Sequence, residues 1–115
     1  DALKNKEKGR TTLADELDTV PATLPALMRA QKLQKRAARC GVAEKDPEQA
    51  RQALQQAVKN WDETSSAQAA GDLLFAAANA MRLAGVDAEE ALTFASRRFC
   101  TECLGQEEQC GNQVE

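Results

Sequence analysis

The chain has 115 residues, with 15 basic residues, 18 acidic residues, a formal net charge of −3 and no histidine. This length fits one small domain, the near balance of charge gives no case for a nucleic-acid partner, and the absence of histidine removes the commonest general base. Since the chain has no apolar run that could span a bilayer and no signal-peptide core, we expect a cytoplasmic protein without a membrane partner.

Residues 1–20 are predicted to form a charged linker or arm. They are rich in Lys, Glu, Asp and Thr, and Gly9 interrupts any helix. Because no sustained apolar stripe runs through them, we expect a solvated segment with at most a short helical start. The chain begins within this segment without a methionine, so we also expect it to be a fragment of a longer protein.

Two helices are predicted in the first half of an all-α domain that spans residues 21–104. Alanine and leucine, both strong helix formers, dominate the apolar residues. The first helix follows the cap signal of Thr23 and Pro25 and ends at Gly41. The second begins at Asp46-Pro47 and runs to about Trp61.

Two further helices complete the predicted fold. The third, over about residues 66–84, follows a possible capping box at Ser65, is apolar on nearly all sides and ends at Gly85. The fourth begins at Asp87, and its predicted core-facing residues are Ala91, Leu92, Ala95, Phe99 and Cys103. A chain this small cannot easily cover an apolar third helix. We therefore expect a four-helix, bundle-like array that is completed by a homodimer, with a flexible tail over residues 105–115.

Three blocks of the sequence carry a family resemblance. They are residues 24–39, the run Gly71-Asp72-Leu73-Leu74-Phe75-Ala76 with Asn79, and residues 83–92 with 97–99. In order and spacing these blocks resemble the C-terminal domain of the MazG family of nucleoside triphosphate pyrophosphohydrolases. The resemblance implies a dimeric nucleotide pyrophosphatase fold that releases NMP and pyrophosphate. It also implies Mg²⁺ held by a Glu-Glu-x-x-Glu motif on one helix and a Glu-x-x-Asp motif on the next.

The metal-binding motifs implied by this resemblance are degenerate. One register places the first motif at Gln56, Ala57 and Asn60, and a slip of one residue places it at Gln55, Gln56 and Lys59. Neither register contains a carboxylate. In the second motif Asp72 is kept as a remnant, but Ala69 stands where the family has glutamate. A lone aspartate cannot hold octahedral Mg²⁺ against its hydration shell, so we expect no bound Mg²⁺.

The sequence therefore predicts a MazG-like domain that is catalytically impaired and acts in dimerisation or nucleotide sensing. No confident catalytic residue remains. A nucleoside triphosphate is a possible ligand, and the candidate nucleotide- or phosphate-binding residues are Arg98, Asn79, Lys32 and Arg36.

Two alternatives stay open at this point. The chain could be a divergent but active Mg²⁺-dependent pyrophosphohydrolase that combines Asp72 with Glu48, Asp62 or Glu63. It could also hold zinc, since Cys100-Thr101-Glu102-Cys103 has the spacing of two zinc ligands, with Cys110 and Cys40 as further candidates.

Overall fold

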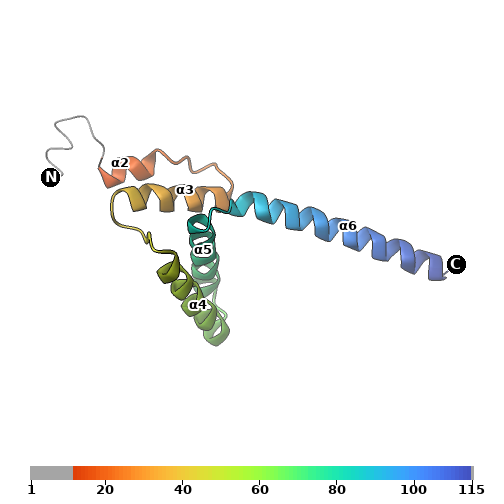
Figure 1. The fold of residues 1–115 in the computed structure, drawn as a ribbon. Helices are drawn as coiled ribbons and strands as arrows, with labels where there is room; N and C mark the ends of the chain where they lie inside the picture. Colours follow the sequence, from red (N-terminus) through yellow and green to blue (C-terminus); the bar gives the residue numbers. More distant parts are fainter. Residues whose placement is uncertain (1–11, 115) are drawn as a thin grey trace.

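The computed structural model describes the backbone of residues 12–114 and the side chains of residues 12–108 (Figure 1). This part of the chain contains helices and no strand, so the predicted all-α class is confirmed. The helices are α2 (Leu13–Asp18), α3 (Ala26–Arg39), α4 (Pro47–Thr64), α5 (Ala67–Leu83) and α6 (Ala88–Val114). None of the described helices is both long enough and apolar enough to cross a membrane.

Side-chain caps and glycines set the ends of the helices much as the sequence predicts. The carboxylate of Asp46 accepts a hydrogen bond from the Glu48 amide at 3.1 Å and caps α4. Asp87 accepts one from the Glu90 amide at 3.0 Å at the start of α6. Gly85 follows α5 with φ +82°, a conformation that residues with a side chain rarely adopt.

Two caps differ from the prediction. Ser66, rather than Ser65, caps α5 and accepts from the Ala69 amide at 3.1 Å, because Ser65 adopts φ +48° and ends α4. The N-cap of α3 is Pro25, which has no side-chain cap, so the expected capping role of Thr23 is wrong.

Residues 12–20 pack on the domain, which corrects the expectation that they belong to a solvated arm. Thr12 and Asp15 form a capping box for α2. Arg36 of α3 pairs with Glu16 at 3.4 Å, and Val20 is only 4% exposed. The rest of the expected arm, residues 1–11, lies outside the described residues.

The core consists of small side chains between closely approaching helices. α4 and α5 form an antiparallel hairpin, and α3 crosses α5 (Figure 1). The buried alanines at these contacts let the helix backbones approach one another, and they are Ala38, Ala50, Ala57, Ala69 and Ala78. One chain leaves part of the apolar α5 uncovered, as the sequence predicts, because Leu74 is 60% exposed and Met81 is 40% exposed.

Gln31 of α3 joins three elements. Its Nε2 donates to the carbonyl of Ala78 at 2.9 Å and to the carbonyl of Val86 at 3.1 Å, while its Oε1 accepts from the Ala88 amide at 3.0 Å. These bonds join a carbonyl within α5, a carbonyl of the loop after it and the first amide of α6, which has no partner within its own helix. They fix the point at which α6 leaves the other helices.

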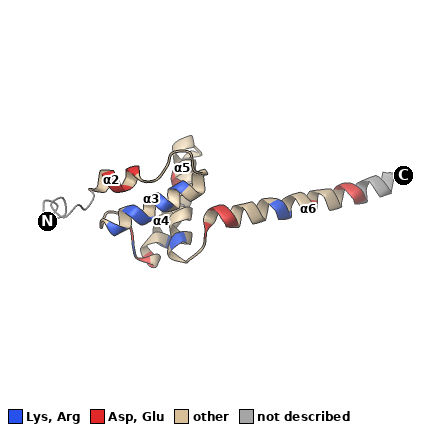
Figure 2. Cartoon of the chain, turned by 90° about the horizontal axis from the view of Figure 1, so that it is seen from above, with Lys and Arg blue, Asp and Glu red and all other residues tan. Residues whose placement is uncertain are grey.

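Helix α6 projects away from the rest of the molecule (Figures 1 and 2). Its 27 residues span about 40 Å at the rise of an α-helix, and the chain measures 75 × 31 × 24 Å. The expected core-facing role of its apolar residues is wrong within one chain, because Leu92 is 55% exposed and Phe99 is 64% exposed. The helix also continues through Gly105 to Val114, so its expected end at the boundary of a flexible tail is wrong.

Candidate functional site

A pocket of about 510 Å³ lies where α4 and α5 face each other, with α3 and the loop before α4 completing its wall. Its volume is in the range of small-molecule sites, about 300–1,000 Å³. Its polar lining residues are Gln34, Glu44, Gln56, Asn60, Asp72 and Asn79.

The pocket contains most of the residues that the sequence predicts for the degenerate metal site. Gln56, Ala57 and Asn60 enter from α4, and Asp72 enters from α5. Helical periodicity explains this, since residues four apart lie on one face of a helix. In the alternative register, Gln55 and Lys59 are exposed and do not line the pocket, so the geometry matches the first register.

Ala69 lies apart from this pocket. It is 7% exposed, is not among the lining residues and donates its amide hydrogen to Ser66 in the first turn of α5. The position where the family resemblance implies a glutamate is therefore a packing position here.

Arg82 fixes the orientation of the Asn79 amide. Its Nε and Nη2 donate to Asn79 Oδ1 at 3.1 and 2.9 Å, and Nη2 also donates to the Glu44 carbonyl at 3.0 Å. Burial lowers the pKa of Arg82, but an arginine keeps its charge at neutral pH. Because Oδ1 already accepts two hydrogen bonds, the Nδ2 group of Asn79 is the part of the amide that can donate to a ligand.

Gln34 contributes a buried acceptor to the pocket wall. Gln34 is only 3% exposed, and its Nε2 donates to the Phe75 carbonyl at 3.0 Å. Among the described residues, Oε1 has no hydrogen-bond partner and no contact with solvent. An unsatisfied buried acceptor of this kind costs about 1–3 kcal/mol, so the site carries unused hydrogen-bonding capacity. Gln34 belongs to no motif that the sequence offers, and its place in the pocket wall depends on the packing of α3 against α5.

The residues of the pocket do not fit a magnesium ion. Of the residues that the structure describes, only Asp72 and Glu44 supply carboxylates to its lining, and Glu44 Oε1 already accepts from the amides of Lys45 and Asp46 at 3.0 and 2.8 Å. Within residues 12–108 no group of three His, Cys, Asp or Glu side chains could hold a metal. Mg²⁺ needs near-octahedral oxygen ligation and dehydrates reluctantly, so this set is too small.

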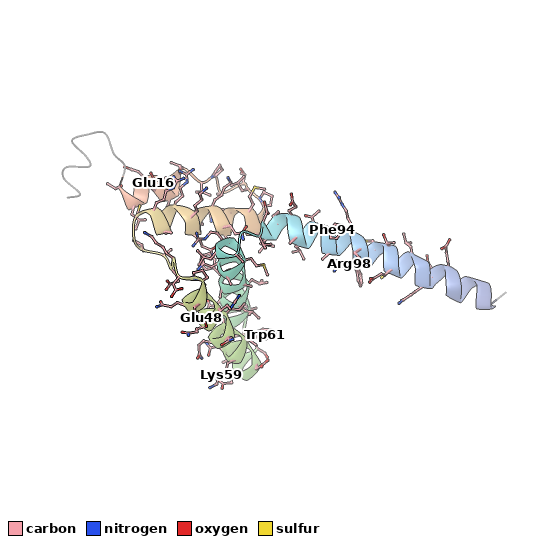
Figure 3. The ribbon with its side chains drawn as sticks, viewed as in Figure 1. Glu16, Glu48, Lys59, Trp61, Phe94 and Arg98 are labelled. Atoms are coloured by element: carbon pink, nitrogen blue, oxygen red, sulfur yellow. The ribbon has the colours of Figure 1, made fainter. Side chains whose placement is uncertain are left out.

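The further carboxylates of the alternative hypothesis lie outside the pocket. Glu48 is 3.8 Å from Arg51 on the exposed side of α4 (Figure 3). Asp62 and Glu63 are exposed near the end of the same helix and do not line the pocket. None of these residues joins Asp72.

Of the four candidate phosphate-binding residues, only Asn79 lines the pocket. Arg36 pairs with Glu16, and Lys32 is exposed on α3. Arg98 lies on the projecting α6, with its guanidinium carbon 5.7 Å from the centre of the Phe94 ring (Figure 3).

The cysteines likewise form no site among the described side chains. Cys40, Cys100 and Cys103 are free and exposed, with Cys40 at the end of α3 and the other two on α6. The side chain of Cys110 lies outside the described residues.

Comparison of the sequence with those of known proteins identifies relatives of this chain. No family model matches the chain. It is 37% identical over 106 residues to a "Nucleoside triphosphate pyrophosphohydrolase" of Escherichia coli (strain K12), a match that covers 84% of the chain and 40% of that protein. It is 32% identical over 101 residues to the "Nucleoside triphosphate pyrophosphohydrolase/pyrophosphatase MazG" of Thermotoga maritima, covering 84% of the chain and 39% of that protein. The chain thus spans about two fifths of the length of these relatives.

Proposed function

We infer that this chain is a MazG-like module whose hydrolase site is impaired. The inference rests on homology to MazG-like nucleoside triphosphate pyrophosphohydrolases over 84% of the length of the chain. The module binds a nucleotide without cleaving it and acts through nucleotide sensing or dimerisation. The pocket between α4 and α5 is the nucleotide site of this proposal.

The proposed loss of hydrolysis rests on one observation. The lining of the pocket has amides at Gln56 and Asn60 and a methyl group at Ala57, where the family resemblance implies carboxylates. A metal ion contributes several kcal/mol of charge stabilisation to phosphoryl transfer. No cationic side chain among the described lining residues could supply that stabilisation instead. Neutral amides are also the stable choice in a pocket without a cation, since clustered carboxylates repel one another.

The exposed apolar surface supports a homodimer. Leu92, Ala95, Phe99 and Cys103 follow one another along α6 at spacings of three or four residues and so lie on one face, which we call the α6 stripe. Large side chains of this stripe are more than half exposed in the single chain. Contiguous exposed apolar surface marks interaction sites, and a second copy of the chain is the partner that we propose.

A pyrophosphate-release assay tests the loss of hydrolysis. We expect no release above the blank when the protein is incubated with each of the common nucleoside triphosphates and with Mg²⁺ or Mn²⁺. The Asp72→Ala variant serves as the control and should give the same background. Turnover that Asp72→Ala abolishes would instead establish a divergent metal-dependent pyrophosphohydrolase.

A further inference from the structure

We propose that the pocket between α4 and α5 binds a nucleobase through Gln34 and Asn79, independently of metal and of phosphate. This inference rests on the proposed nucleotide site and goes beyond it, because it assigns the pocket to the base and not to the triphosphate. The ligand class is a nucleoside, an uncharged planar base that carries adjacent hydrogen-bond donors and acceptors.

The first argument is that hydrogen bonds fix the orientation of two side-chain amides in one pocket. The Phe75 carbonyl holds Nε2 of Gln34 at 3.0 Å, which leaves Oε1 as an acceptor without a partner. Arg82 occupies Oδ1 of Asn79 with two hydrogen bonds, which leaves Nδ2 as a donor. A pocket with one acceptor and one donor held in place complements the edge of a nucleobase, which also presents a donor beside an acceptor.

The second argument is charge. Among the described residues no lysine or arginine lines the pocket, and the ionisable side chains that do, Asp72 and Glu44, are both acidic. Arg82 contacts two lining residues, but its guanidinium donates to Asn79 Oδ1 and to the Glu44 carbonyl. A triphosphate in this pocket would face two carboxylates and no cation, whereas an uncharged base meets no such repulsion.

The third argument is an aromatic ring beside the amides. Phe75 lines the pocket and is 50% exposed, so part of its aromatic side chain is available to contact a base. Gln34 Oε1 is enclosed, so a ligand donor reaches it only after a small shift of the pocket wall. The new hydrogen bond would satisfy an acceptor that is otherwise buried without a partner.

The test is a calorimetric titration of the full chain in EDTA with adenosine, cytidine, guanosine and uridine, and with their triphosphates. We expect saturable binding of at least one nucleoside, with no gain in affinity from the triphosphate. Asn79→Asp keeps an oxygen for Arg82 but removes the amide donor, and it should weaken this binding by about tenfold or more. Gln55→Glu, exposed on α4 and outside the pocket, adds the same charge and should leave the affinity unchanged.

The outcomes separate this inference from the proposed function. Nucleoside binding that depends on Asn79 supports the base-binding pocket. Absence of nucleoside binding overturns it, as does binding that Asn79→Asp leaves unchanged, or binding confined to the triphosphates. The loss of hydrolysis is read independently from pyrophosphate release, so either proposal can fail without the other. Melting temperatures of both variants establish that each is folded.

Discussion

Replacing Gln56 and Asn60 together by glutamate is expected to create a divalent-cation site in the pocket. Gln56 Nε2 lies 3.1 Å from Asn60 Oδ1, so the two new carboxylates would be neighbours one helical turn apart on α4. Asp72 lines the same pocket from α5. The variant would therefore place three carboxylates from two helices in one pocket.

The expected signature of this site is a stability that depends on metal. Without a cation the three carboxylates repel one another, and the melting temperature should fall below that of the unmodified protein. Mn²⁺ should then raise it, since a ligand at a hundred times its dissociation constant stabilises the folded state by about 2.7 kcal/mol. Thermal unfolding at increasing Mn²⁺ concentration measures both effects.

A matched control separates this site from general charge effects. The Gln52→Glu/Gln55→Glu variant adds the same two charges to exposed positions on α4, outside the pocket, and should show no specific response to Mn²⁺. Equal responses of the two double variants would contradict the assignment of Gln56 and Asn60 to the former metal positions.

Replacing Leu92 and Phe99 by glutamate is expected to convert the proposed homodimer into a monomer. Both side chains belong to the α6 stripe, and the described part of the chain leaves more than half of each uncovered, with exposures of 55% and 64%. At an interface each glutamate would bury a charge without a partner. We expect the dissociation constant of the dimer to rise at least about a hundredfold, because large apolar side chains at the centre of an interface carry most of its energy.

Analytical ultracentrifugation over a range of protein concentrations measures this change. Thr101→Glu is the matched control, because Thr101 lies on α6 away from the stripe and its hydroxyl bonds to the Arg97 carbonyl in the same helix. A monomeric unmodified protein would contradict the proposed dimer, and a double variant that remains dimeric would show that another surface forms it.

Local sequence signals predict the helices of this chain well. Asp46 and Asp87 are caps that act within one turn, and Gly85 ends a helix through its own backbone conformation. Helical spacing within α4 also predicts that Gln56 and Asn60 share a face. These features depend on residues that are close in sequence.

Long-range contacts are the features that the sequence could not supply. The orientation of Asn79 depends on Arg82, which is held in turn by a carbonyl of the distant loop before α4. The unpartnered oxygen of Gln34 depends on where the Phe75 carbonyl lies on another helix. For α6, periodicity identifies an apolar face but not what covers it, which is why the stripe was wrongly expected to face the chain's own core.

Direct titration of the unmodified protein with Mn²⁺, followed by electron paramagnetic resonance of the free ion, tests the central claim most directly. We expect no saturable binding below millimolar concentrations, and the same result for Asp72→Asn, because Asp72 has too few companion carboxylates in the described lining to hold the ion. Saturable binding in the micromolar range that Asp72→Asn abolishes would contradict the loss of the metal site, and with it the loss of hydrolysis.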